Sequence, residues 1–247
     1  MVCDRIVHHP SIVKTVRFLD SSDAKDKVFR LLQFLCKLLY TGRLSQRAKY
    51  LEYQLILVRK FLLILKPLVH LQRASMLYDD TLTSDQILRF LKIVKSLCYA
   101  AYLALDNINL LRMLRLLPTT AIFEIKIPYL TKLMWLWGLI FSVSSDLRNI
   151  QVIQLRLAEL RTAIRPNGFS LINHKGKIKG EVDITKTKAA IKTTTSERYY
   201  ALRRFLCDVL DTFVVLNSLG YLKSKGEYVA LAGMITSTIA IQDLWNS

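Results

Sequence analysis

Residues 127–145 carry a single charged side chain, Lys132, and the last 13 of them, residues 133–145, carry none. Trp135 and Trp137 follow the lysine closely, and a lysine beside tryptophans is typical of a membrane–water interface. About 20 apolar residues are needed to cross a bilayer, so this stretch is just long enough. The sequence therefore predicts a membrane-inserted helix here, with a buried helix of a soluble protein as the alternative.

Glycine and proline are scarce in this chain of 247 residues, with 8 and 5 occurrences, whereas leucine occurs 44 times. Leucine, lysine, arginine, alanine and glutamine favour helices, and few turn residues are available to connect short strands. We therefore expect an all-α, membrane-associated protein with long amphipathic helices and one or two hydrophobic membrane-inserted segments.

A second apolar stretch, residues 228–242, is uncharged between Glu227 and Asp243. Its 15 residues are short for a complete membrane span. Small side chains recur through it at helical spacing, which allows two helices to approach closely. The residues predicted to pack in this way are Ala232, Gly233, Thr236, Ser237 and Ala240.

The formal net charge of the chain is +17, although 52% of its residues are hydrophobic. Such a charge implies a polyanionic partner, either nucleic acid or the anionic headgroups of a membrane. A nucleic-acid-binding protein usually presents its basic residues beside polar and stacking aromatic groups on a soluble fold. Here the basic residues border long apolar helical faces, so the pattern favours an anionic phospholipid membrane and no nucleic acid.

Residues 48–78 show the clearest amphipathic pattern in the chain. Apolar residues recur every three or four positions along one side, and basic residues occupy the other. Such a helix can insert its apolar side into a leaflet while its lysines and arginines meet anionic headgroups. The predicted apolar face consists of Leu55, Val58, Phe61, Leu62, Leu65 and Val69. The predicted basic, membrane-binding face consists of Arg59, Lys60, Lys66 and Arg73.

Pro67 interrupts this segment. It lacks a backbone donor and clashes with the preceding turn, so it is expected to kink or break the helix. The alternative to membrane binding is a helix that packs its apolar stripe into a protein core and leaves its basic side in water. Periodicity alone does not distinguish the two.

Composition divides the chain into four regions. These are an amphipathic-helix region (1–118), a hydrophobic helix with the helix after it (119–165), a basic linker (166–196) and a C-terminal helical region with the second hydrophobic segment (197–247). The linker is lysine-rich without apolar periodicity, so we expect it to be exposed and mobile. In the first region, Asp106 and Asn107 are expected to interrupt a helix that Pro118 ends.

The sequence contains no catalytic or cofactor-binding fingerprint. It lacks the glycine-rich nucleotide loops, the H-E-x-x-H zinc motif and the G-x-S-x-G nucleophile motif. Its four cysteines are scattered without paired spacing, which argues against a zinc site and against a disulfide framework. Asp106 and Asp146 adjoin apolar stretches, where a helix cap or a polar contact within the membrane is a better interpretation than acid–base catalysis. We therefore expect a protein that is not an enzyme and that needs no cofactor or metal.

Short motifs spread over nearly the whole chain, except for residues 166–196, resemble the peroxin-11 family of peroxisomal membrane proteins, and most closely its fungal members. They include Phe18-Leu19-Asp20, Arg30-Leu31-Leu32-Gln33, Val58-Arg59-Lys60-Phe61-Leu62, Leu65-Lys66-Pro67-Leu68, Asn109-Leu110-Leu111-Arg112, Ala201-Leu202-Arg203-Arg204, Leu219-Gly220-Tyr221-Leu222 and Glu227-Tyr228-Val229-Ala230-Leu231. No single motif is a fingerprint, but so many in the same order are specific together.

The resemblance implies a protein of the peroxisomal membrane that promotes peroxisome elongation, fission and proliferation. In that family an amphipathic helix inserts into the cytosolic leaflet and generates curvature, and residues 59–68 match it. The resemblance also implies self-association into a homo-oligomer, action upstream of a dynamin-like GTPase and its membrane adaptor, and delivery by the peroxisomal membrane-protein import receptor. An alternative function is a pore for small metabolites, for which the candidate polar residues are Asp106, Asn107, Asn109, Ser142 and Ser144.

Overall fold

The computed structural model describes residues 9–42, 46–80, 85–118, 120–164 and 180–246. These residues form helices and short connections and contain no β-strand, as the composition predicts. The helices in chain order are α2 (Pro10–Asp20), α3 (Ser22–Thr41), α4 (Gln46–Leu62), α5 (Lys66–Asp79), α6 (Gln86–Met113), the π-helical turn η1 (Ile122–Lys126), α7 (Ile127–Ile164), α8 (Gly180–Ser218) and α9 (Gly226–Asn246).

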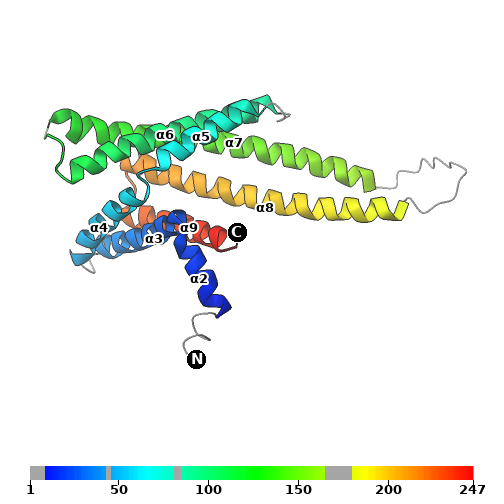
Figure 1. The fold of residues 1–247 in the computed structure, drawn as a ribbon, viewed down its shortest axis with the longest axis horizontal. Helices are drawn as coiled ribbons and strands as arrows, with labels where there is room; N and C mark the ends of the chain where they lie inside the picture. Colours follow the sequence, from blue (N-terminus) through cyan, green and yellow to red (C-terminus); the bar gives the residue numbers. More distant parts are fainter. Residues whose placement is uncertain (1–8, 43–45, 81–84, 119, 165–179, 247) are drawn as a thin grey trace, which may run out of the picture.

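The long helices α6, α7 and α8 run along the molecule, while α4 lies at one end and α2 projects to the side (Figure 1). Helix α7 packs between α6 and α8, and the α7–α8 pair extends well beyond the other helices. Helix α3 packs against α4 on one side and α9 on another, while α5 lies along α6. The four regions expected from composition are therefore interleaved, because α3 from the first region contacts α9 from the last.

Local sequence signals set several helix ends. Gly42 closes α3, and its amide donates to the carbonyl oxygen of Leu38 at 2.9 Å. Asp85 caps α6, since its carboxylate accepts hydrogen bonds from the amides of Ile87 and Leu88. After α8 the chain turns at Gly220, whose φ of 83° is readily adopted only by glycine.

Helix α6 continues without a break through Asp106 and Asn107, so the predicted interruption at these residues is wrong. Both side chains have partners on another segment, which removes their tendency to compete with the helix backbone. Asp106 forms an ion pair with Lys60, and the Asn107 side-chain amide donates to the carbonyl oxygen of Ile64 at 2.8 Å. These polar residues therefore connect α6 to the α4–α5 segment.

The linker prediction is wrong for its second half, because α8 begins at Gly180 and includes residues 180–196. Residues 166–179 lie outside the described residues. The threonines that suggested a linker fit the helix, since Thr194 and Thr195 donate their hydroxyls to carbonyl oxygens four residues earlier. Thr194 is also buried, and Ile191 packs against the core between α7 and α8. Tertiary packing therefore stabilises a helix that apolar periodicity alone does not reveal.

Two buried clusters hold the bundle together. One joins α3, α8 and α9 through Phe34, Val214, Val229 and Ala232. The other joins α7 and α8 through Ile150, Ile153, Leu157 and Ala201. The first connects α3 to the two C-terminal helices, whereas the second joins two helices that follow one another in the chain.

Within the described residues, one helix is long and apolar enough to cross a membrane by length and composition. It comprises Ile122–Thr162, that is, η1 together with most of α7, and contains the apolar stretch at residues 127–145. The structure is thus a helical bundle with one candidate inserted helix, within the range expected from the sequence.

Candidate membrane-inserting surface

The amphipathic segment forms two helices separated at Pro67. Helix α4 ends at Leu62 and α5 begins at Lys66, so the proline breaks the helix, as predicted. The proline nitrogen has no hydrogen and therefore cannot donate a backbone hydrogen bond. Just before it, the amide of Lys66 donates to the carbonyl oxygen of Leu63, three residues earlier, at 3.0 Å. Asn107 binds the carbonyl oxygen of Ile64, so the break leaves that oxygen paired.

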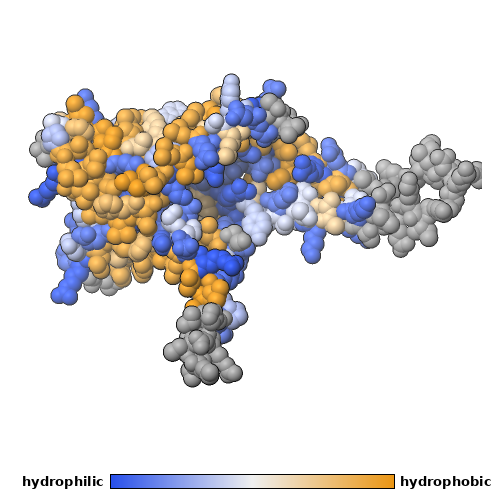
Figure 2. Space-filling view, in the orientation of Figure 1, coloured by the Kyte–Doolittle hydropathy of each residue, from blue (hydrophilic) through white to orange (hydrophobic). Residues whose placement is uncertain are grey.

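The apolar side of this segment faces outward. Of the six residues predicted for the apolar face, Val58, Phe61, Leu65 and Val69 are exposed, while Leu55 and Leu62 are half-buried. Leu65 is the most exposed of them at 70%, and its neighbour Leu68 is 63% exposed. Figure 2 shows hydrophobic residues over much of this face at the end of the molecule where α4 and the α6–α7 connection lie. In this conformation the stripe is therefore not packed into a protein core.

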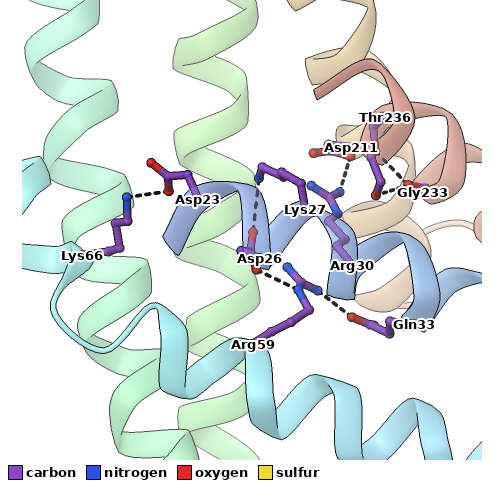
Figure 3. A network of polar contacts seen from close by, with 11 residues as sticks. Asp23, Asp26, Lys27, Arg30, Gln33, Arg59, Lys66, Asp211, Gly233 and Thr236 are labelled. Atoms are coloured by element: carbon purple, nitrogen blue, oxygen red, sulfur yellow. Dashed lines mark hydrogen bonds and ion pairs between the residues drawn. The ribbon is translucent and has the colours of Figure 1, made fainter. Parts of the chain in front are cut away.

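The basic side of the segment faces inward. The Arg59 guanidinium lies 2.8 Å from the Asp26 carboxylate and donates to the Gln33 side chain at 2.5 Å. Figure 3 shows Arg59 and Lys66 reaching two carboxylates on α3, those of Asp26 and Asp23. The Lys66 amine lies 2.5 Å from the Asp23 carboxylate.

A second contact connects α4 to another helix, α6. Lys60 forms an ion pair with Asp106 on α6, and both side chains are largely buried. Three of the four residues predicted to meet headgroups, Arg59, Lys60 and Lys66, are thus paired with carboxylates of the same chain. Arg73 is exposed and makes no side-chain hydrogen bond or ion pair with the described residues, so of the four it alone is available to a headgroup here.

The carboxylate at the centre of this network is Asp26, whose side chain is only 4% exposed. Burial raises the pKa of Asp26, but the charges of Arg59 and Lys27 outweigh that effect, so the pKa lies below its ordinary value. Asp26 is therefore negatively charged at neutral pH. Nearby on the same helix, Arg30 pairs with Asp211 of α8 at 2.5 Å (Figure 3). Helix α3 thus connects α4, α5 and α8 through charged side chains.

The polarity of this part of the molecule is inverted relative to a water-soluble domain. Charged and polar groups, among them Asp26, Arg30 and Asp106, are buried and paired, whereas leucines and phenylalanines cover the outside. In a membrane, ionisable side chains face the interior of a helix bundle and pair with one another. In a water-soluble domain, by contrast, the charged side chains would lie on the surface and the apolar stripe would be buried. The observed arrangement therefore fits a bundle whose apolar outer surface contacts lipid.

Sequence reasoning did not assign Asp23, Asp26 or Gln33 to the site. Nothing in their local sequence indicates which helix they face, because their partners lie 26 to 43 residues further along the chain. Asp106 was the detectable exception, since a carboxylate beside an apolar stretch indicates a polar contact.

The small residues predicted for helix packing lie on α9 where it meets α3. Ala232, Gly233, Thr236 and Ser237 are buried, and Ala240 is half-buried. A Cβ atom at Gly233 would lie 2.4 Å from two carbon atoms of the Phe34 ring, so only glycine permits this contact. The hydroxyl of Ser237 donates to the carbonyl oxygen of Gly233 at 2.6 Å, so this buried hydroxyl has a hydrogen-bond partner within its own helix. Here the small residues pack helices of one chain together.

The polar residues considered for a metabolite pore bind other groups of the same chain. Besides Asp106 and Asn107, Asn109 accepts a hydrogen bond from Arg112, Ser142 donates to Asp208, and Ser144 donates to the carbonyl oxygen of Ile140. These five residues contribute to packing between or within helices.

The fold and this surface together define a helical membrane protein with a charged interior and an amphipathic segment on its outside. A sequence profile of the family described as Peroxisomal biogenesis factor 11 (PEX11) matches residues 12–245. The chain therefore belongs to the peroxisomal biogenesis factor 11 family. It is a peroxisomal membrane protein of the machinery for peroxisome biogenesis and proliferation.

Individual relatives agree with the family match over their full lengths. Peroxisomal membrane protein PMP27 of Saccharomyces cerevisiae is 41% identical over 247 residues, covering 100% of both chains. Peroxisomal membrane protein PMP30A of Candida boidinii is 29% identical, covering 100% of this chain and 99% of its own. Peroxisomal biogenesis factor 11 of Schizosaccharomyces pombe is 26% identical over 97% of both chains. No solved structure matches the chain. The family is one of biogenesis factors rather than of enzymes.

Proposed function

We propose that the protein promotes peroxisome elongation and fission by inserting the apolar surface of α4 and α5 into the cytosolic leaflet. The observation that carries this proposal is the outward-facing apolar stripe around Leu65, which is exposed on a protein of the peroxisomal membrane. A row of large apolar side chains that enters one leaflet expands that leaflet alone. The resulting area difference favours positive curvature, and so elongation.

The ion pairs give the inserted segment a rigid support. Helix α4 is held by Asp26 from α3 and by Asp106 from α6, with its apolar side left outward. In this arrangement insertion is driven by the apolar residues, and Arg73 adds attraction to anionic lipid. A basic residue near an anionic membrane surface contributes about 1 kcal/mol.

A charge reversal at Arg59, Lys60 and Lys66 does not test membrane binding by itself. Glutamates at these positions would face Asp26, Asp106 and Asp23, so such a variant would also lose the contacts between helices. A test of insertion needs a residue that is largely exposed and makes no ion pair inside the protein. Leu65, at 70% exposed, meets that requirement.

The Leu65→Asp variant is expected to remodel membranes poorly while keeping its fold. Burying a leucine contributes about 2 kcal/mol, so partition of the segment into the leaflet should fall roughly 30-fold. The matched control is Leu155→Asp on the charged half of α7, because Leu155 is 64% exposed and receives the same substitution. Full-length protein reconstituted into vesicles of phosphatidylcholine and phosphatidylserine is examined for tubules by electron microscopy.

Tubulation should persist for Leu155→Asp and be lost for Leu65→Asp. In cells that lack the native protein, Leu65→Asp should leave fewer and larger peroxisomes than Leu155→Asp. Equal tubulation by the two variants would show that the surface around Leu65 does not insert.

The proposal includes the partners implied by the family resemblance. These are anionic phospholipid, a second copy of this chain, a dynamin-like GTPase with its membrane adaptor, and the import receptor for peroxisomal membrane proteins. Curved, elongated membrane is the substrate on which a dynamin-like GTPase assembles, which supports placing this protein upstream of it. Self-association is tested by co-precipitating two differently tagged copies from solubilised peroxisomes, and recovery of one tag alone would contradict it.

A further inference from the structure

A cavity of about 930 Å³ lies among α5, α6, α7 and α8. Five basic residues from these four helices line it, namely Arg73, Lys92, Lys95, Arg156 and Arg204. None of the five makes a side-chain hydrogen bond or ion pair with the described residues. This contrasts with Arg59, Lys60 and Lys66, which are all paired.

Carboxylates do not balance this charge. Of the acidic residues that line the cavity, Asp85 is paired with Arg148 at 2.8 Å, which leaves Asp146 and Glu197. Asp208 lies behind Asp146 and is bound to Ser142. Five unpaired cations therefore share the cavity with two carboxylates, those of Asp146 and Glu197, and the cavity is electropositive.

His70 also lines the cavity, and its pKa is affected by the neighbouring basic residues. Its pKa lies below the ordinary value because burial disfavours the charged imidazole and because Arg73, Lys66 and Lys95 repel it. The surroundings of His70 therefore disfavour additional positive charge.

The cavity lies where two helices, α6 and α7, change from charged to uncharged sequence. On α6, Lys92 and Lys95 precede the uncharged residues 96–105. On α7, the uncharged residues 133–145 end at the cavity. In a membrane-inserted bundle, such a boundary lies at the level of the lipid headgroups.

We propose that this cavity binds the phosphomonoester group of an anionic phospholipid, as in phosphatidic acid. A phosphomonoester carries close to two negative charges at neutral pH and accepts several hydrogen bonds, which suits a set of unpaired lysines and arginines. Basic pockets between helices at the membrane surface bind phospholipid headgroups in this way. Leu77, Leu88 and Ile153 line the same cavity and provide an apolar wall for the start of an acyl chain. The proposal does not depend on insertion of α4 and α5.

The Lys92→Gln/Lys95→Gln variant tests it, because both side chains are half-buried in the cavity wall without partners. The control, Lys186→Gln/Lys188→Gln, removes the same charge from exposed positions of α8 outside the cavity. Full-length protein in neutral detergent is titrated calorimetrically with dioctanoyl phosphatidic acid, with glycerol phosphate, with inorganic phosphate and with dioctanoyl phosphatidylcholine.

Phosphatidic acid should bind the wild type and the control alike, and binding to the cavity variant should be weaker by at least about tenfold, since charged hydrogen bonds are the strong ones. Preference for phosphatidic acid over glycerol phosphate identifies a lipid as the source of the phosphate. If glycerol phosphate binds as tightly as phosphatidic acid, and the cavity variant loses this binding, the phosphate site is supported but its ligand is a soluble phosphate. Equal affinities of the cavity variant and the control, or no binding of any phosphate, would overturn the proposal. If the cavity variant does not fold, Arg156→Gln/Arg204→Gln replaces it, since both side chains are exposed.

Discussion

An Asp26→Asn substitution is expected to destabilise the protein by about 3 kcal/mol, because removal of one partner of a buried ion pair leaves the other charge uncompensated. Asp26 is the carboxylate around which Arg59, at 2.8 Å, and Lys27, at 3.4 Å, are arranged. Without it, these cations lose their counter-charge in a site from which water is largely excluded. The loss should appear as a lower melting temperature of the purified protein in detergent and as faster proteolysis between α3 and α4.

The same helix offers a matched control for this prediction. Asp23 is three residues earlier and pairs with Lys66, but its side chain is 51% exposed. Because exposed pairs contribute little, Asp23→Asn should cost less than about 1 kcal/mol. Combining Asp26→Asn with Arg59→Met removes both charges and should restore much of the lost stability. Equal melting temperatures of Asp26→Asn and Asp23→Asn would contradict the central position of Asp26.

The second large effect is expected at Gly233. An alanine Cβ at this position would lie 2.4 Å from Cε2 and Cζ of Phe34, and the Phe34 ring is itself buried among Val214, Val229 and Ala232. Alanine favours helix by about 1 kcal/mol over glycine, but the overpacked contact should reverse this and give a net destabilisation of about 2 kcal/mol. Gly233→Ala should therefore lower the melting temperature and loosen α9 from α3.

Gly138→Ala serves as the control, since a Cβ there would meet Tyr99 at 3.4 Å, an ordinary contact distance. It is expected to leave stability unchanged or to raise it slightly. The clash at Gly233 should be relieved by shortening its partner, so Phe34→Leu combined with Gly233→Ala should be more stable than Gly233→Ala alone. A double variant less stable than both single variants would show that the Phe34 contact is not the cause.

Periodicity predicted the helices of this protein well, because each pattern depends only on neighbours along the chain. The break at Pro67 follows from the backbone properties of proline. The outward apolar stripe of α4 and α5 was also visible, but a stripe has the same period whether it faces lipid or a protein core.

The direction of the charged side chains could not be predicted in the same way. Arg59 and Lys60 are adjacent, yet their partners Asp26 and Asp106 lie on different helices, 33 residues before and 46 residues after them. Only the packing of α4 between α3 and α6 brings these groups together. For the same reason α8 was missed at residues 180–196, where helix formation is supported by contacts with α7 rather than by an apolar pattern of its own.

In the membrane, the surface around Leu65 is expected to lie in lipid while the charged network lies inside the bundle. This arrangement is tested most directly with a spin label at position 65, introduced as Leu65→Cys in a variant whose natural cysteines are replaced by serine, in full-length protein reconstituted into anionic vesicles. Leu155→Cys on the charged half of α7 is the control. We expect the label at position 65 to collide freely with oxygen and rarely with a water-soluble nickel complex, and the label at position 155 to show the opposite. Frequent collision with the nickel complex at position 65 would place this surface in water and contradict the account.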